Sequence, residues 1–107
     1  MSLPSVSDTV NILNADRMAL LPKGAYVVNV GRGTAIDQDA LIAALDSDHL
    51  AGAALDVVVP EPLPADHPLR KAKNLLLTPH VAGNMTLGYT CERNVQLFCE
   101  NLENYAA

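Results

Sequence analysis

Positive charge is scarce in this chain. Its 107 residues include 7 Lys and Arg against 12 Asp and Glu, which gives a net charge of −5, and the basic residues form no cluster. Because nucleic acids and anionic membranes are bound by clustered basic side chains, neither is expected as a partner. No apolar run is long enough to cross a bilayer, and the N-terminus has no basic segment followed by an apolar one. We therefore expect a soluble, cytoplasmic protein.

Cysteine is also rare, and its two copies cannot pair with each other. Cys91 and Cys99 fall in one predicted helix, so their Cα atoms lie roughly 12 Å apart, beyond the reach of a disulfide. No cluster of Cys and His has the spacing of metal ligands, and no metal site is expected. We interpret both cysteines as packing residues.

Apolar sequence is abundant, with 50% hydrophobic against 18% charged residues, which suffices for the core of one small domain. Helix and strand patterns alternate along it, and this alternation predicts an α/β fold with a parallel sheet and right-handed crossovers. We expect strands over 26–30, 52–58 and 74–78, and helices over 15–21, 38–47 and 86–105. The segment 59–73 contains four prolines and should be an ordered loop without regular structure. The last helix should carry an apolar stripe of Cys91, Val95, Phe98, Leu102 and Tyr105.

The stretch 25–37, AYVVNVGRGTAID, organises the rest of the chain. Its strand is too apolar to be half exposed, so we expect it to be buried on both faces. The turn Gly31-Arg32-Gly33 follows, and Asp37 then caps the next helix, as Asn14 caps the one before. Ligands of open α/β sheets bind beyond the carboxyl ends of the strands, so Arg32 is a candidate anion clamp. The alternative is a surface arginine in a turn.

Each predicted strand is followed by one ionisable side chain: Arg32, Glu61 and His80. The carboxyl ends of parallel strands meet at one edge of a sheet, so these three groups can converge on one site. A histidine beside a carboxylate suits proton transfer near neutral pH, and an arginine suits a substrate carboxylate or a carbonyl that gains negative charge. Carboxylate-bearing carbonyl compounds are then the natural substrates. The alternative is a loop histidine, a solvated glutamate and a turn arginine.

Three further ionisable residues need an interpretation. Asp56 lies near the end of an apolar strand, where an unpartnered carboxylate is costly. It could cap a neighbouring helix or contact a polar cofactor group, and we favour the second. His49 and His67 lie in connections, and we expect both to be solvated and without a role.

Three segments, LPKGAYVVNVGRGTAID, HLAGAALDVVVPEPLP and NLLLTPHVAGN, resemble successive blocks of the D-isomer-specific 2-hydroxyacid dehydrogenases, and most closely their glyoxylate/hydroxypyruvate reductase branch. The resemblance implies that Arg32 binds the substrate carboxylate and carbonyl, that His80 is the general acid/base and that Glu61 is its partner. It implies NAD or NADP as cofactor, with NADP slightly favoured by the branch, and a small 2-oxo or 2-hydroxy acid as substrate. The implied cofactor contacts are Val30, Gly31 and Arg32, Asp56 at the nicotinamide carboxamide, and His80, Val81, Ala82 and Gly83 along the nicotinamide.

The family's dinucleotide motif GxGxxG is absent, since position 36 after Gly31 and Gly33 is Ile. The resemblance therefore implies that residues 1–107 are the C-terminal part of a Rossmann-type dinucleotide-binding domain, a fragment without the GxGxxG half and without the substrate domain. We expect it to be inactive alone, and to self-associate or form a homodimer through an exposed half-sheet.

Two other readings stay open. One is a non-catalytic half-domain that acts as a dimerisation or interaction module. The other is a formate dehydrogenase of the same superfamily, against which Glu61 argues, because a glutamine is the usual partner of the histidine there. A GxGxxG upstream in the same reading frame would favour the dehydrogenase, and a genuine start codon would favour the module.

Overall fold

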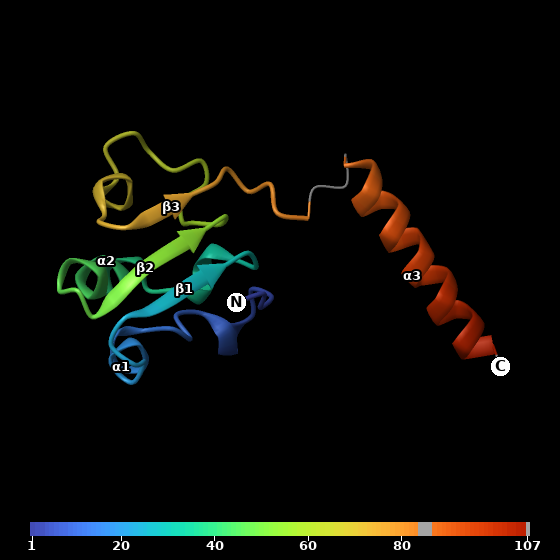
Figure 1. Ribbon diagram of the computed structural model, residues 1–107, viewed down its shortest axis with the longest axis horizontal. Helices are drawn as coiled ribbons and strands as arrows, with labels where there is room; N and C mark the ends of the chain where they lie inside the picture. Colours follow the sequence, from blue (N-terminus) through green and yellow to red (C-terminus); the bar gives the residue numbers. More distant parts are fainter. Residues whose placement is uncertain (84–86, 107) are drawn as a thin grey trace.

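The computed structural model describes residues 1–83 and 87–106, and its centre is a three-stranded parallel sheet (Figure 1). The strands lie in the order β1-β2-β3. Both pairs are parallel, which confirms the parallel sheet that the alternation of elements predicts. The elements are η1 (Ser7–Thr9), α1 (Ala15–Ala19), β1 (Ala25–Asn29), η2 (Gly33–Ala35), α2 (Gln38–Asp46), β2 (Leu50–Leu55), η3 (Pro68–Lys71), β3 (Leu75–Leu77) and α3 (Gly88–Ala106), where η denotes a 3-10 helix.

Side-chain caps begin the two short helices where the sequence predicts them. The Asn14 side chain accepts a hydrogen bond from the N–H of Arg17, and the Asp37 carboxylate accepts one from Ala40. Each cap satisfies an amide that has no partner within its helix. The strand ends differ from the prediction, since β2 begins at Leu50 and ends at Leu55, so Asp56 follows the strand.

The core lies between the sheet and the helices α1 and α2. Leu41 and Leu45 lie four residues apart, so they share one face of α2. The fully buried core side chains include Met18, Leu41, Leu45, Leu50, Leu55 and Leu69. Each buried leucine contributes about 2 kcal/mol of hydrophobic stabilisation. This core fixes the positions of the strand ends that carry the ionisable residues.

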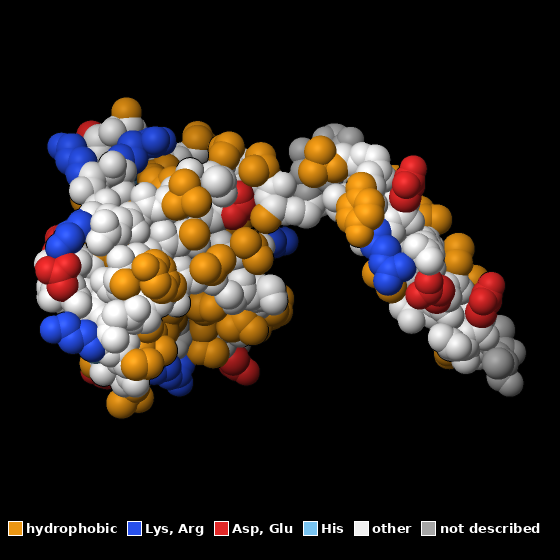
Figure 2. Space-filling view, in the orientation of Figure 1, with side chains coloured by type: hydrophobic (Ala, Val, Ile, Leu, Met, Phe, Trp, Pro, Cys, Tyr) orange, Lys and Arg blue, Asp and Glu red, His pale blue; other side chains and the backbone are white. Residues whose placement is uncertain are grey.

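The other face of the sheet is open, which corrects the expectation that the first strand is buried on both faces. Tyr26 is 76% exposed, Val28 51% and Leu76 61%. Apolar side chains are visible over this part of the molecule (Figure 2). The strand alternates, with Val27 and Asn29 against the core, and no described element covers the side where Tyr26 and Val28 point. Apolar composition shows that a strand can be buried on both faces, but burial needs a second layer.

Helix α3 stands apart from the sheet and from α1 and α2 (Figure 1). The predicted start of this helix, Thr86, lies outside the described residues. Its apolar stripe is exposed along its length, with Phe98 at 66% and Tyr105 at 90%. Cys91 and Cys99 are free and exposed, so the interpretation of both as packing residues is wrong for this structure. The stripe has the expected period, and no other described element packs on it.

The proline-rich loop contains one regular turn, η3, where no regular structure was predicted. Leu69 anchors it, since this side chain is 1% exposed. Arg70 holds the loop closed, because its guanidinium donates to the carbonyls of Leu63 and Pro64 at 2.6 and 2.8 Å. These contacts hold the loop before η3 and fix η3 itself to the core. Over the described residues, we find no helix with the length and apolar character that a membrane span requires.

Candidate active site

The turn that carries Arg32 is built by Asn29, the last residue of β1. Asn29 is fully buried, accepts a hydrogen bond from the N–H of Gly31 at 3.1 Å and donates one to the carbonyl of Arg32 at 2.9 Å. An amide can satisfy both groups because it carries a donor and an acceptor. The exposed Arg32 side chain folds back so that its Nη1 donates to the Gly31 carbonyl at 2.8 Å.

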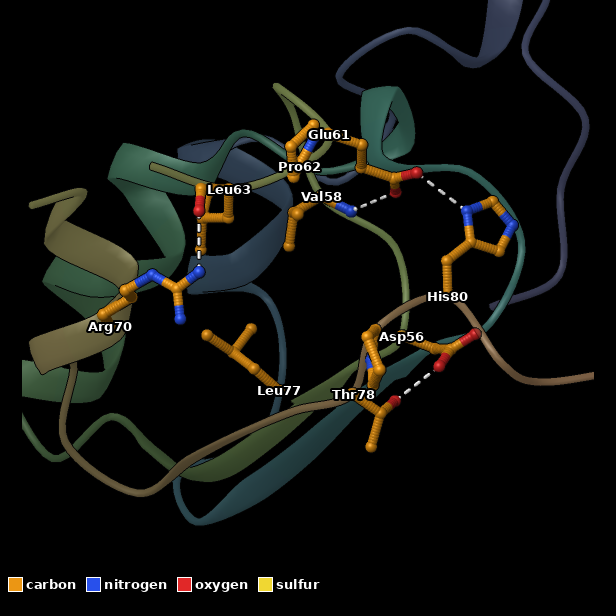
Figure 3. Close-up of a pocket in the computed structure, with 10 residues that line it drawn as sticks. Asp56, Val58, Glu61, Pro62, Leu63, Arg70, Leu77, Thr78 and His80 are labelled. Carbon is orange, nitrogen blue, oxygen red and sulfur yellow. Dashed lines mark hydrogen bonds and ion pairs between the residues drawn. The ribbon is translucent and has the colours of Figure 1, made fainter. Parts of the chain in front are cut away.

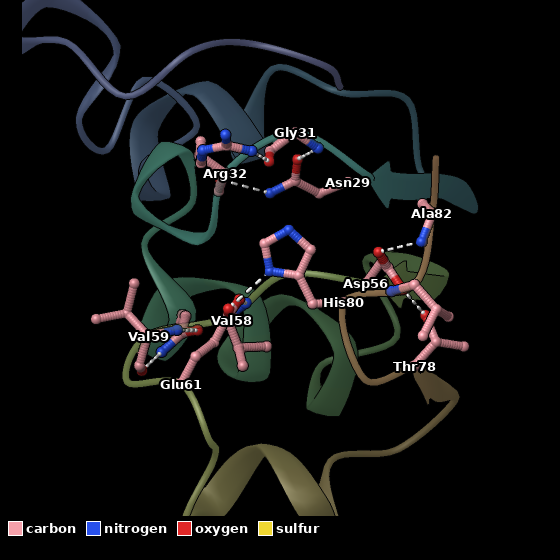
Figure 4. Close-up of polar contacts among 12 residues, drawn as sticks. Asn29, Gly31, Arg32, Asp56, Val58, Val59, Glu61, Thr78, His80 and Ala82 are labelled. Atoms are coloured by element: carbon pink, nitrogen blue, oxygen red, sulfur yellow. Dashed lines mark hydrogen bonds and ion pairs between the residues drawn. The ribbon is translucent and has the colours of Figure 1, made fainter. Parts of the chain in front are cut away.

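Glu61 and His80 form a hydrogen-bonded pair. His80 Nδ1 lies 2.7 Å from Glu61 Oε2, and the other carboxylate oxygen accepts from the N–H of Val58 at 2.9 Å. The His80 hydrogen bond, followed by that of Val58, lowers the pKa of the Glu61 carboxyl below its ordinary value. Both side chains remain partly exposed, at 37% and 46%, so a ligand can reach them. The pair joins two loops that follow different strands (Figure 4).

Asp56 holds the segment around His80. Its carboxylate accepts hydrogen bonds from the Thr78 hydroxyl and from the N–H groups of Val81, at 2.9 Å, and Ala82, at 2.8 Å. Burial, with 6% exposed, raises the pKa of this carboxyl, but the three donors outweigh it and the pKa lies below its ordinary value. The Asp56 carbonyl also accepts from the N–H of His80 at 2.9 Å.

These contacts explain the backbone of His80, which has a φ of +54°. Such a conformation is costly for a residue with a side chain and persists where its surroundings hold it. Of the two interpretations of Asp56, capping a neighbouring helix is wrong, because the carboxylate ties the end of β2 to the residues after β3.

The three predicted ionisable residues lie at one edge of the sheet. Arg32, Glu61 and His80 follow β1, β2 and β3, and the imidazole lies between the Arg32 turn and the Glu61 loop in Figure 4. Only two of them touch: among the described residues, no hydrogen bond or ion pair joins Arg32 to Glu61 or His80. The arrangement places a partly exposed imidazole–carboxylate pair, at the ends of β3 and β2, on the same sheet edge as a cation at the end of β1.

A cavity of about 620 Å³ opens beside the Glu61–His80 pair (Figure 3). Its lining is largely apolar, with Leu63 and Leu77 in it, and Arg70 lies at the end away from His80. Glu61 and His80 line this cavity and Arg32 does not.

The residues that the family resemblance implies for cofactor contact lie around the same edge. Val30 and Val81 are 48% and 47% exposed, which suits contact with an apolar ring face. Gly31 is buried, and a Cβ there would come within 2.7 Å of the Leu3 backbone. Gly83 is exposed, has a φ of +75° and has open space around it. In the described part of the chain, no group of three or more His, Cys, Asp or Glu side chains could hold a metal.

Two histidines have partners that the sequence analysis did not foresee. The His49 ring nitrogen Nε2 lies 3.0 Å from the Met18 carbonyl, and His67 Nδ1 accepts from the N–H of Leu69 at 3.2 Å to cap η3. Both are partly buried, so the expectation of solvated side chains is wrong. Each ring satisfies a nearby backbone group and lies outside the Glu61–His80 pair.

Sequence reasoning also missed residues that shape the site. Asn29 and Thr78 left a signal, because each is a polar residue within or directly after an apolar strand. Gln38 left none: it is an ordinary helix residue in the sequence, and its contact with Val59 spans 21 positions.

Comparison with known proteins adds three findings. Residues 1–82 match the family model described as D-isomer specific 2-hydroxyacid dehydrogenase, NAD binding domain. A glyoxylate/hydroxypyruvate reductase A of Salmonella paratyphi B is 46% identical over 80 residues, which is 75% of this chain and 26% of that protein. The crystal structure of a D-isomer specific 2-hydroxyacid dehydrogenase from Xanthobacter autotrophicus, in complex with NADPH and MES, is 51% identical with a TM-score of 0.72, over 76% of this chain and 26% of that one.

A third relative covers almost the whole chain. The NAD-dependent formate dehydrogenase of Staphylococcus aureus, solved in complex with NAD, is 35% identical with a TM-score of 0.75, over 98% of this chain and 32% of that one. The chain therefore spans between a quarter and a third of the length of each of these three proteins.

Proposed function

Because this chain belongs to the D-isomer specific 2-hydroxyacid dehydrogenase family, we propose that it supplies the proton-transfer and substrate-anchoring residues of an NAD(P)-dependent oxidoreductase. The substrate is a small 2-oxo acid such as glyoxylate or hydroxypyruvate, reduced to the 2-hydroxy acid. Residues 1–107 are the C-terminal part of its dinucleotide-binding domain. Relatives in the reductase branch support this choice of substrate.

The observation that carries the proposal is the 2.7 Å contact between His80 Nδ1 and Glu61 Oε2. With its pKa lowered, Glu61 is a carboxylate near neutral pH and can only accept, so Nδ1 carries the proton of this bond. The proton that His80 gains and loses is then on Nε2. The carboxylate orients the ring through Nδ1, and the imidazolium gives its Nε2 proton to the oxygen on C2 of the 2-oxo acid. In the reverse direction neutral His80 takes that proton back.

Arg32 holds the substrate carboxylate in this proposal. Its side chain is exposed, and within the described chain its one hydrogen bond is from Nη1 to the Gly31 carbonyl. Its other N–H donors are therefore available to a substrate carboxylate. A guanidinium binds a carboxylate with two parallel hydrogen bonds, and it stabilises negative charge that develops on the neighbouring carbonyl oxygen. Asn29 keeps the turn under Arg32 in place.

The cofactor that the family uses supplies a hydride to C2 when it is bound. Exposed Val30 and Val81 suit the nicotinamide ring, and the segment from His80 to Gly83 lies along the same edge. Asp56 could meet the carboxamide, although three donors of its own chain already occupy its carboxylate. We favour NADP slightly over NAD, on the resemblance to the reductase branch. Both cofactors occur among the relatives, since one has been solved with NADPH and another with NAD.

The test is reduction of glyoxylate and hydroxypyruvate by the product of the complete reading frame, followed as loss of NADPH or NADH absorbance. Replacing His80 by Gln should lower kcat by about 10²- to 10⁴-fold, the usual contribution of a general acid. His49→Gln is the matched control and should leave the rate unchanged. Residues 1–107 alone should show negligible turnover, because they lack the glycine loop that binds pyrophosphate. An unchanged kcat in H80Q would refute the assignment.

A second candidate function, a dimerisation or interaction module, is supported by two surfaces. The open sheet face with Tyr26 and Val28 and the exposed stripe of α3 with Phe98 both leave large apolar side chains in water. Exposed apolar patches of this kind mark association surfaces. We propose self-association as a homodimer through the half-sheet, and a cytoplasmic location, as properties compatible with either function.

A further inference from the structure

Gln38, the first residue of α2, makes two hydrogen bonds to one residue of the Glu61 loop. Its Nε2 donates to the Val59 carbonyl at 2.6 Å, and its Oε1 accepts from the Val59 N–H at 2.8 Å. The amide pairs with Val59 as a neighbouring strand would, by satisfying both backbone groups of a single residue. Only Asn and Gln carry a donor and an acceptor in this arrangement, and the bonds do not depend on pH because neither group titrates.

Val59 and its neighbour Val58 form a junction between the two halves of the site. Glu61 Oε1 accepts from the Val58 N–H at 2.9 Å. A Cβ on Gly33, the residue after Arg32, would lie 2.4 Å from the Val58 carbonyl carbon and oxygen, so the two backbones are already in close contact. Gln38 of α2 therefore fixes the backbone at Val59, and Gly33 packs against it at Val58. The N–H of Val58 then binds the Glu61 carboxylate.

The Glu61 loop is thus clamped on both sides of Glu61. Gln38 binds two residues before it, at Val59, and Arg70 binds after it, at the carbonyls of Leu63 and Pro64. Arg70 belongs to η3, which Leu69 anchors in the core, and it fixes the loop after Glu61. Gln38 fixes the loop before Glu61 to α2, next to Val58, whose N–H donates to the Glu61 carboxylate.

We infer that Gln38 is a positioning residue for Glu61, which it keeps within hydrogen-bond reach of His80 by fixing the Val59 backbone to α2. This inference rests on the proposed role of Glu61 as the partner of His80. Gln38 itself touches neither residue of the pair. Its action is mechanical: without the clamp the loop samples more conformations, and the Glu61–His80 contact is populated for less of the time.

The test is a carboxyl titration of Glu61 in the 107-residue chain, measured by NMR on its side-chain carboxyl carbon. The pKa of Glu61 is lowered first by the His80 hydrogen bond and then by that of Val58, while the Asp56 carboxylate raises it. In Q38A the pKa of Glu61 should rise toward its ordinary value, because both lowering contacts loosen. The Val59 amide should also exchange with solvent faster than in the unaltered chain.

Two further variants sharpen the test. D39A removes the exposed polar side chain next to Gln38 in the same helix turn, and it should change neither the Glu61 titration nor Val59 exchange. Q38N keeps both a donor and an acceptor on a side chain that is one methylene shorter and does not titrate, so its effect should lie between those of the unaltered chain and Q38A. Q38N also serves as the informative variant if Q38A does not fold.

In an H80A background Glu61 lacks its imidazole partner, so replacing Gln38 should move the Glu61 pKa by less than it does when His80 is present. Faster Val59 exchange with an unchanged Glu61 titration would overturn the inference, because the clamp would then be structural only. Unchanged Val59 exchange would overturn it as well, because there would be no clamp. Reductase activity does not enter these measurements, so their failure leaves the proposed reaction to its own assay.

Discussion

Replacing Asp56 by Asn should destabilise the fold at neutral pH by about 2 kcal/mol. The Asp56 carboxylate is buried, and its two oxygens accept three hydrogen bonds. Oδ1 accepts from Thr78 and Val81, and Oδ2 accepts from Ala82. In D56N the amide oxygen can keep the two donors at Oδ1, but the NH₂ group then faces the Ala82 N–H, donor against donor.

The magnitude follows from these contacts. A hydrogen bond to a charged acceptor contributes about 1.5–3 kcal/mol net, and one between neutral groups about 1 kcal/mol. D56N loses the Ala82 bond and the charge assistance of the other two, part of which the lower desolvation of a neutral side chain offsets. The sum is about 2 kcal/mol, and Asp56→Ala, which leaves all three donors without an acceptor, should cost more.

The pH dependence identifies the carboxylate as the cause. The pKa of Asp56 is lower in the folded chain than its ordinary value of about 3.9, so the ionised form stabilises the fold at neutral pH. This stabilisation disappears as the pH falls through the ordinary value and then through the folded-state pKa, because a protonated Asp56 no longer accepts as an anion. The difference between the unaltered chain and D56N should therefore be largest at pH 7 and shrink toward pH 3.

Urea unfolding at each pH measures this difference. The methyl signals of the buried residues Leu41 and Leu55 are suitable probes, because they belong to the core and not to the isolated α3. Glu61, whose pKa is also lowered, is present in both proteins, so its contribution largely cancels in the comparison. A difference that stays constant from pH 7 to pH 3, or its absence at pH 7, would refute the reasoning.

Two other predictions concern packing. Gly33→Ala should destabilise the fold by about 3 kcal/mol in denaturant unfolding, because its Cβ would collide with backbone atoms of Val58 at 2.4 Å. Gly88→Ala is the control. Gly88 has open space around it, so this substitution should be neutral or slightly stabilising. Replacing Tyr26 and Val28 by Lys should weaken self-association in analytical ultracentrifugation, because both are more than half exposed on the open sheet face. An unaltered chain that is monomeric at high concentration would contradict the proposed association.

The sequence was sufficient for the architecture, and the reasons are local. Apolar runs bounded by glycine and polar residues predict strands, and the caps Asn14 and Asp37 mark where helices begin, since these signals act within a few residues of the chain. Alternation of helix and strand then implies parallel strands, whose carboxyl ends share one edge. For this reason the sequence alone predicts Arg32, Glu61 and His80 at that edge.

The tertiary structure decided what depends on partners distant in the chain. Composition does not show whether an apolar face is buried. The core-facing side of β1 is buried and the apolar stripe of α3 is exposed, because a face is buried only where another layer covers it. The Gln38–Val59 clamp spans 21 positions and the Asp56–Ala82 bond spans 26. Sequence spacing does not predict such contacts. The sequence gives the donors and acceptors of each side chain, but only the folded chain determines which distant group lies within hydrogen-bond distance.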